Sequence, residues 1–386
     1  YQPTNFSKSL AKTLIEENPD NYIPICISNP KVNDEAHHYL NLNSYDSYKE
    51  LFKCLKTENI DTIVDVSLYE DFKKHCENSI DSKHYFYMFK ALFDITFKTD
   101  FTYKLILNNA YEIDGNEDHI SPTSTEISGF FKGILEEVPK AKFSIYDIDF
   151  KTDFKKILNE IWKPTTSFLN GYRNNKRYIP EIIKETEKTS NINKDVYSNS
   201  DSYLITGGLG DIGLHIAKNI SNQKKVTFHL LTRRRKPFKD DILKEITNNG
   251  STVCIHTLDI TNEQKMKELS LKIGKVDGIF HCAGNAGDGF VYNKSITSFS
   301  NVLDPKKLGM LHIEKYYLHE NIKFLVCFSS IVSLLGGAGQ TDYAAGNSFM
   351  DGFIINLRKK GFNAISINWP SWKNIGMAKR YNVSDQ

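Results

Sequence analysis

The chain has 386 residues, which is long for one domain, so two domains are expected. Hydrophobic residues make up 40% and charged residues 25%, ordinary values for a globular protein with a sizeable core. The net charge of +2 argues against nucleic acid or an anionic membrane surface as the main partner. No apolar run reaches the roughly 18 residues of a membrane span, so no membrane association is expected.

The cysteines form no pattern typical of metal sites or disulfide frameworks. The six are Cys26, Cys54, Cys76, Cys254, Cys282 and Cys327. No two of them have CxxC spacing, so we expect no metal and a reducing, cytoplasmic compartment. The chain opens on Tyr1 without a signal-peptide pattern and ends on Gln386 in a polar stretch. We therefore expect a piece of a longer polypeptide.

The first half alternates short apolar runs with helix-like stretches. The runs, expected to be strands, are 22–28, 60–68, 103–107 and 143–148; the expected helices are 47–56, 84–97 and 123–137. Ser121-Pro122 is a start signal for the last helix. This alternation predicts a parallel α/β sheet. No strand here runs into a Gly-rich turn, so we expect a nucleotide-type fold that binds no nucleotide.

Charged residues near the end of this half receive no functional role. The basic cluster of Arg173, Lys176 and Arg177 is expected to be a solvated face. Asp147 and Asp149 are expected to end a strand and cap the next turn. The polar stretch 184–201 has the composition of a linker, which predicts one domain over residues 1–195 and a second over 196–386.

The second half begins with a strand, a glycine-rich turn and a helix. Residues 203–206 form the strand, 207–213 the turn with a GxGxxG pattern, and LHIAKNI the helix. In this setting the glycines allow a tight turn and close approach of a dinucleotide pyrophosphate to the helix N-terminus. The expected cofactor-binding residues are Thr206, Gly207, Gly208, Leu209, Gly210, Ile212 and Gly213.

The next strands also end in cofactor-type residues, as expected for a doubly wound sheet. Thr232 is followed by three arginines, Arg233, Arg234 and Arg235, where an NAD-preferring site would usually place an acidic residue. Arginines suit a 2′-phosphate, so NADPH is the expected cofactor; the alternative is a solvated basic loop. The remaining expected cofactor contacts are Asp259, which suits an adenine amino group, Ile260, and the small residues Ala283 and Gly284.

Candidate catalytic residues follow an apolar strand at 324–328. Ser330 lies 13 residues before Tyr343, and Asn347 lies four after it, on the same face of an expected helix. A serine at a strand end and a tyrosine on the next helix can converge on one carbonyl oxygen. Ser329 points to the opposite face and is expected to be structural, and Ser333 is expected to be a hydrogen-bonding loop residue.

Seven motifs occur in the order TGGLGDIG, LLTRRR, LDIT, FHCAG, DPKKLG, FSSIVSLLGGAGQTDYAAGN and INWPSW. Together they resemble the ketoreductase domain of a type I polyketide synthase or animal-type fatty acid synthase, within the short-chain dehydrogenase/reductase superfamily. The match covers residues 203 to about 378 and extends more weakly to the first half. The resemblance implies two Rossmann-like units: a truncated N-terminal structural subdomain without cofactor, and a catalytic subdomain with a doubly wound parallel sheet.

The resemblance also completes the catalytic set. Most short-chain reductases place a lysine four residues after the tyrosine, where this chain has Asn347. In ketoreductases the lysine comes from a helix that begins with a Pro-Lys motif, which Lys306 matches; its neighbour Lys307 is the alternative. The nicotinamide loop would hold Pro370 and Ser371, here in place of the commoner Gly-Pro order. Trp369 would be either core or cofactor wall.

The implied reaction is hydride transfer from NADPH to a 3-oxoacyl thioester on an acyl carrier protein, giving the 3-hydroxyacyl thioester. Tyr343 would be the general acid and Ser330 a hydrogen-bond donor to the same oxygen, while Lys306 lowers the pKa of Tyr343 and Asn347 positions Lys306 or a relay water. The implied partners are other synthase domains and a homodimer partner. The alternatives are a non-catalytic scaffold domain and a stand-alone short-chain dehydrogenase.

Two residues would orient the substrate. Asp288 keeps only the last position of the Leu-Asp-Asp triplet of B-type ketoreductases. Gln340 stands where A-type ketoreductases have a tryptophan, three residues before Tyr343. The resemblance therefore implies the B-type hydroxyl configuration.

Overall fold

The computed structural model describes residues 25–26, 38–42, 44–56, 60–68, 80–95, 100–149, 151–153, 160–163, 165–184, 196–234, 240–287 and 289–370. Arg235, Asp288 and Ser371 lie outside these residues. No helix in the described part of the chain combines the length and apolar character needed to cross a membrane. Within the same residues, no cluster of three or more His, Cys, Asp or Glu side chains could hold a metal ion.

The chain divides into two compact units. The first comprises residues 1–181, 289–299 and 336–341, and the second comprises residues 182–288, 300–335 and 342–386. Two short segments of the second half therefore cluster with the first unit. The described parts of both units are α/β with Rossmann-like parallel strands, which confirms the predicted fold class.

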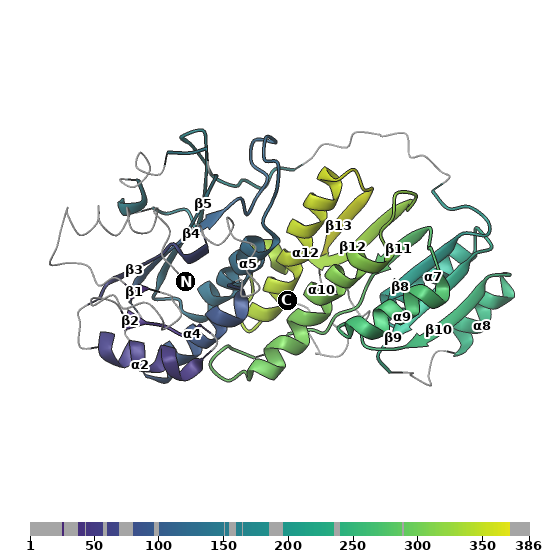
Figure 1. Cartoon of the computed structure of the whole chain (residues 1–386), viewed down its shortest axis with the longest axis horizontal. Helices are drawn as coiled ribbons and strands as arrows, with labels where there is room; N and C mark the ends of the chain where they lie inside the picture. Colours follow the sequence, from purple (N-terminus) through teal and green to yellow (C-terminus); the bar gives the residue numbers. More distant parts are fainter. Residues whose placement is uncertain are drawn as a thin grey trace. The chain divides into compact units, whose positions relative to one another are not determined.

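The first unit is built on a five-stranded sheet (Figure 1). Strands β3 (Thr62–Asp65), β4 (Thr102–Asn108), β5 (Lys142–Ile148) and β6 (Leu169–Arg173) are parallel, and β7 (Lys176–Tyr178) pairs antiparallel with β6. Its helices are α2 (Tyr45–Leu55), α4 (Ser82–Asp94) and α5 (Pro122–Glu137). A separate parallel pair joins β1 (Ile25–Cys26) and β2 (His38–Tyr39). The strands and helices predicted for this half are confirmed where the structure describes them.

Aromatic side chains form the core of the first unit. Rings of α4, α5 and the sheet stack edge-to-face or tilted at centroid distances of 4.9 to 6.2 Å, as between Phe89 and Phe131, Tyr103 and Phe131, and Phe86 and Phe299. Such pairs add about 0.5–1.5 kcal/mol each beyond the burial of their area. Helix α5 begins as predicted, with Ser121 as N-cap and Pro122 in its first turn.

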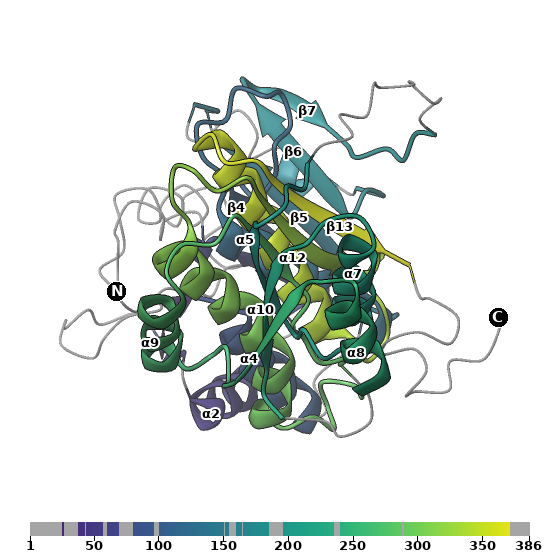
Figure 2. The ribbon, with the colours of Figure 1, turned by 90° about the vertical axis from the view of Figure 1, so that its right-hand side faces the viewer.

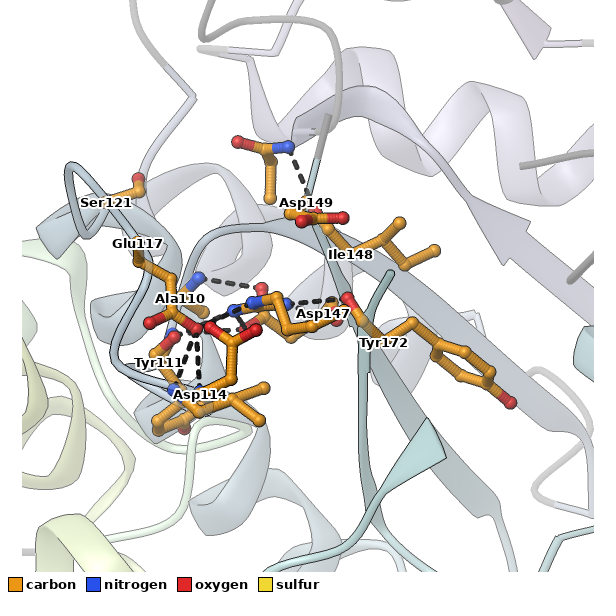
Figure 3. A network of polar contacts seen from close by, with 12 residues as sticks. Ala110, Tyr111, Asp114, Glu117, Ser121, Asp147, Ile148, Asp149 and Tyr172 are labelled. Carbon is orange, nitrogen blue, oxygen red and sulfur yellow. Dashed lines mark hydrogen bonds and ion pairs between the residues drawn. The ribbon is translucent and has the colours of Figure 1, made fainter. Parts of the chain in front are cut away.

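The carboxyl ends of β4, β5 and β6 are covered by a buried polar network (Figure 3). Arg173, only 1% exposed, pairs with Glu117 and Asp147 at 2.8 Å each. Asp147 accepts from the backbone N–H groups of Ala110 and Tyr111. The expectation that Arg173 belongs to a solvated face was therefore wrong: β6 is buried on both faces at its carboxyl end, and Arg173 pairs there with two carboxylates distant in sequence.

Asp147 also departs from its predicted role. It lies next to the end of β5, as expected, but its carboxylate holds the chain that follows β4 instead of capping the next turn. Asp149 does cap a turn, since it accepts from the backbone N–H of Thr152.

The second unit contains a six-stranded, all-parallel sheet in the order β10-β9-β8-β11-β12-β13. The strands are β8 (Ser202–Thr206), β9 (Thr227–Thr232), β10 (Thr252–Thr257), β11 (Gly278–His281), β12 (Phe324–Ser330) and β13 (Ala364–Trp369). The order reverses between β8 and β11, and ligands of doubly wound sheets bind at such a switch point.

Helices cover both faces of this sheet. Helices α7 (Asp211–Ser221) and α8 (Asp240–Asn248) bury one face, and α9 (Glu263–Ile273), α10 (Ile296–Tyr317) and α12 (Thr341–Lys359) bury the other (Figure 2). A short helix, α11 (Val332–Leu335), follows β12. The core therefore lies in two layers around the strands, and the strand ends are free to form a site.

Helix α10 corrects the position expected for the Pro-Lys motif. The helix begins at Ile296, so Pro305 lies inside it rather than at its start. Proline has no N–H for the carbonyl of Asn301, four residues back. The side chain of Asn285 supplies the missing donor, with its Nδ2 2.7 Å from that oxygen.

Candidate active site

Helix α12 and strand β12 bring Tyr343, Asn347 and Ser330 together. Tyr343 and Asn347 lie one turn apart near the start of α12, and the Asn347 side chain donates to the Tyr343 carbonyl at 2.8 Å. Ser330 is the last residue of β12. Burial raises the pKa of Tyr343 above 10.0, and hydrogen bonds from the Ser330 and Asn347 side chains oppose that rise. The spacing read from the sequence thus corresponds to a real convergence of side chains.

Lys306 is the lysine beside the tyrosine. Its Nζ lies 5.2 Å from the centre of the Tyr343 ring, whereas Nζ of Lys307 lies over Phe349. Lys306 is 2% exposed, and burial lowers its pKa from 10.5 to about 8. Lys306 is thus a buried cation beside the Tyr343 ring, and a cation near a phenol is the kind of charge that stabilises a phenolate.

The amide oxygen of Asn347 is buried without a hydrogen-bond partner among the described residues. A buried polar atom without a partner is costly, and such an atom beside a reactive tyrosine fits a water or ligand group that would complete it. Asn347 can therefore hold a polar group next to Lys306 and Tyr343.

The glycine turn after β8 forms a close-fitting cradle. Gly207 has a positive φ of 63°. A Cβ on Gly208 would lie 2.8 Å from the Ile205 carbonyl oxygen and from Leu230 Cβ, so only glycine fits. Gly210 is the N-cap of α7, and no side chain caps that helix. The N-terminal amides of α7 are therefore available to an anion.

Four other predicted residues at the turn are placed by packing. Thr206 and Leu209 are buried, Ile212 is half-buried, and Gly213 lies so close to Gly208 that a side chain would clash. Thr206 accepts at Oγ1 from the Ala283 N–H and lies 2.7 Å from His281 Nδ1. This link fixes the loop after β11 to the glycine turn.

His281 is a residue that the sequence reasoning passed over. It ends β11, is fully buried, and has no hydrogen-bond partner at Nε2 among the described residues. Burial and the nearby Lys306 lower its pKa to about 3, so the imidazole is neutral. A histidine at the end of an otherwise apolar strand was the available signal.

The loop after β11 lies against the lysine. A Cβ on Gly284 would lie 3.2 Å from Lys306 Cε and 3.3 Å from its Nζ. Asn285, which replaces the hydrogen bond lost at Pro305, ties the same loop to α10. Ala283 and Gly284 are thus held next to Lys306.

The predicted cofactor contacts after β9 and β10 differ in how exposed their side chains are. Arg233 and Arg234 are exposed, and Thr232 donates to the Arg234 carbonyl at 2.8 Å. Asp259 accepts from the backbone and side chain of Thr261, which fixes its carboxylate at the strand end. The Ile260 side chain is buried in the core.

Other predicted residues are placed as follows. Pro370 is exposed and follows β13, where Trp369 stacks on Phe328 at 5.9 Å, so Trp369 packs on the sheet. Gln340 is half-buried and its N–H donates to the Gly337 carbonyl. Ser333 lies in α11, where its hydroxyl is buried and hydrogen-bonded.

The chain is similar to known proteins in sequence and in fold. Residues 201–374 match the family model of the KR (ketoreductase) domain. The chain is 31% identical over 218 residues to polyketide synthase PksN of Bacillus subtilis, covering 53% of this chain and 4% of that protein. It is 33% identical over 211 residues to a 6-methylsalicylic acid synthase of Aspergillus niger, covering 50% and 12%.

Solved KR structures share the fold. An N-terminal ketoreductase from the macrolactin assembly line superposes with a TM-score of 0.78 at 23% identity, over 98% of this chain and 79% of that one. A ketoreductase domain from the bacillaene assembly line gives 0.65 at 24%, over 83% and 82%. KR domains of polyketide synthases are oxidoreductases that bind a nicotinamide cofactor. The chain spans only 4% to 12% of the length of the synthases it resembles.

Proposed function

We propose that the chain is an NADPH-dependent ketoreductase that reduces a 3-oxoacyl thioester, carried on an acyl carrier protein, to the 3-hydroxyacyl thioester. The observation that carries the proposal is the convergence of four side chains in the second unit. Lys306 lies beside the Tyr343 ring, and Ser330 and Asn347 form hydrogen bonds with Tyr343. A non-catalytic scaffold would not need a buried lysine next to a buried tyrosine, since burying an ammonium is costly.

The residues present fit a nicotinamide dinucleotide. The uncapped N-terminus of α7 and the glycine turn suit a pyrophosphate, because a Cβ at Gly208 would occupy the space that the backbone leaves open. Exposed Arg233 and Arg234 follow β9 and suit a 2′-phosphate, which favours NADPH over NADH. Asp259 would accept from the adenine, and Ala283 and Gly284 would face the dinucleotide beside Lys306.

The chain's own residues supply acid catalysis. When bound, the cofactor supplies the hydride that reaches the β-carbon of the substrate. Tyr343 donates its phenolic proton to the oxygen that gains charge, and Ser330 donates a hydrogen bond to the same atom. The Lys306 ammonium stabilises the Tyr343 phenolate that is left behind. The Asn347 oxygen holds a polar group, such as a water, that can return a proton.

The finer assignments are part of the proposal. They comprise a structural subdomain over residues 1–195, a catalytic subdomain over 196–386, and a homodimer formed through a parent synthase. Gln340, rather than tryptophan, supports a B-type hydroxyl configuration. Asp288, whose structure is not described, would complete that assignment.

The test is NADPH oxidation with a 3-oxobutyryl thioester, followed in wild type and in Tyr343→Phe. We expect turnover in the wild type and a loss of about a hundredfold or more in the variant, because the general acid is removed. Tyr316→Phe is the matched control, since Tyr316 is a half-buried tyrosine of α10 whose hydroxyl hydrogen-bonds Glu263 at the surface. Its rate should stay within about twofold of wild type, as for most surface substitutions.

Three further arms separate the alternatives. Replacing NADPH with NADH tests the role assigned to the arginines. A carrier-bound substrate compared with a free alcohol separates a synthase domain from a stand-alone dehydrogenase. NADPH binding without turnover of any substrate would favour the scaffold alternative and contradict the proposal.

A further inference from the structure

A carboxylate on the catalytic helix, Asp351, organises a half-buried polar network next to Ser330. Asp351 lies eight residues after Tyr343 on α12, about two turns along the helix. Its oxygens accept from three side chains: Ser333 at 2.6 Å, Ser366 at 2.5 Å and Asn368 at 2.9 Å. An ionised carboxylate is acceptor-only, so three converging donors suit it better than they suit an amide or a hydroxyl.

Asn368, on β13, extends the network to the end of β12. Its Nδ2 lies 2.7 Å from Ser333 Oγ, 3.2 Å from Ser329 Oγ and 3.3 Å from the Ser330 carbonyl oxygen. The Ser333 hydroxyl also lies 2.9 Å from that Ser330 oxygen. The Ser330 carbonyl therefore lies within hydrogen-bond distance of the Asn368 amide and the Ser333 hydroxyl, and both of these groups also contact Asp351; the single Ser333 proton serves either Asp351 or Ser330 at one time.

The same network returns to the catalytic helix. The Ser329 hydroxyl lies 3.4 Å from the Asn347 carbonyl oxygen. Thus β12, α11, α12 and β13 are joined by side-chain hydrogen bonds just behind Ser330 and Asn347. Misplacing a reacting group by about 1 Å can cost a hundredfold in rate, so a device that fixes Ser330 against α12 has direct value for catalysis.

We propose that Asp351 and Asn368 are positioning residues, which hold Ser330 in the placement from which it acts together with Tyr343. This inference rests on the ketoreductase function proposed above. Neither residue touches the reacting atoms. Both act through Ser333 and through the backbone of Ser330.

The test uses Asp351→Asn, Asn368→Asp and the exchange of the two in one protein. Each single variant places like groups together, two amides in one and two carboxylates in the other. The double variant again pairs an amide with a carboxylate. We expect kcat to fall by about 10- to 100-fold in each single variant and to recover by about tenfold in the double variant.

Two measurements separate positioning from a general structural role. The Kd for NADPH, measured by fluorescence, should stay within about threefold of wild type, because the glycine turn is untouched. Hydrogen exchange of the segment 326–335 should be faster in the single variants than in wild type. In the double variant its rate should return toward that of wild type. Glu314→Gln, which removes a carboxylate paired with Lys360, is the control and should change neither.

The outcomes distinguish the two proposals. Unchanged kcat in folded single variants would overturn the positioning role. Equal losses of kcat and of NADPH affinity, with no recovery in the double variant, would overturn it as well. If the wild type shows no turnover, the ketoreductase proposal fails, and hydrogen exchange alone decides the positioning role. Unchanged exchange over 326–335 would then overturn it.

Discussion

The two units finish the carboxyl edge of a parallel sheet in opposite ways. In the first unit, the helix that follows β4 is capped by its own Ser121, which accepts from the Ser124 N–H. In the second, the helix that follows β8 has Gly210 as N-cap and no capping side chain. The first unit satisfies its helix amides internally, and the second leaves them available.

The charges follow the same division. In the first unit Asp147 accepts the amides of Ala110 and Tyr111, and Glu117 accepts the amides of Ile113 and Gly115. Arg173 pairs with both carboxylates. In the second unit, glycines stand where such side chains would be, and the cation of the site, Lys306, is buried beside a neutral tyrosine. One edge carries its own anions, and the other suits the anions of a ligand.

The largest effect, on the free energy of unfolding, is expected from removing the buried cation at the carboxyl edge of the first unit's sheet. Arg173→Met would leave Glu117 and Asp147 buried without their cation, at a cost of about 3–5 kcal/mol in the free energy of unfolding. Denaturant unfolding measures it. Arg177→Met is the matched control, because Arg177 is exposed and bonds Asn170 and Thr165, so its loss should cost about 1 kcal/mol or less. Equal stability of the two variants would show that the ion pairs of Arg173 with Glu117 and Asp147 do not stabilise this edge of the sheet.

The next largest effect, on the affinity for NADPH, is expected from adding a side chain to the glycine turn of the second unit. Gly208→Ala places a Cβ 2.8 Å from a backbone oxygen that cannot move freely. We expect the affinity for NADPH to fall by about tenfold or more, because the turn must shift away from its cradle geometry. Fluorescence titration measures it.

A matched control separates clash from backbone strain. Gly274→Ala also changes a glycine, one with a φ of 71° but with nothing within 4 Å of the added Cβ. It should lower stability, by about 1 kcal/mol, and leave the affinity unchanged. A Gly208→Ala variant that binds NADPH like wild type would remove the glycine turn from the proposed cofactor site.

Much of the second unit could be predicted from its sequence because its signals are local. The turn at 207–213 lies between one strand and one helix, and Ser330, Tyr343 and Asn347 lie within 18 residues of each other. Short-range spacing fixes which strand end and which helix face they occupy. In the first unit, alternating runs predicted β1, β3, β4, β5 and the three helices, but not β2, β6 or β7.

What could not be predicted depends on contacts between distant residues. Arg173 looks like part of an exposed basic cluster until β6 is placed beside β5 and beneath the chain around Glu117. Pro305 looks like a helix start until Asn285 is seen to replace its missing donor. Asp351 lies outside every motif, and Asn368 belongs to INWPSW without any sign of its contacts, because the partners of both residues come from three separate segments.

The groups around Lys306 make its titration distinct. Burial lowers the pKa of His281 to about 3, and it raises the pKa of the Cys282 and Cys327 thiols, so these groups are neutral near pH 8. Asp351 is the anion whose charge favours the Lys306 ammonium. Burial also raises the pKa of Tyr343, so the tyrosine keeps its proton over the same range.

The smallest effect is therefore expected from pH. Because the pKa of Lys306 is lowered to about 8, the ammonium that supports proton donation by Tyr343 is present below pH 8 and lost above it. The rate should fall by about tenfold per pH unit above that value. The pH profile of kcat measures it, and Lys307→Met should leave the profile unchanged, whereas the residual rate of Lys306→Met should lack this limb.

Stability must change in the other direction, which separates titration from unfolding. A lysine whose folded pKa is below its unfolded value of 10.5 destabilises the fold while both states are protonated. That penalty is relieved as pH rises from about 8 to 10.5, because the folded state releases its proton first. Activity should thus fall over a range in which Lys306 makes the fold more stable. If activity and the free energy of unfolding fall together as the pH rises, the loss of rate is due to unfolding. The titration of Lys306 would then not be its cause.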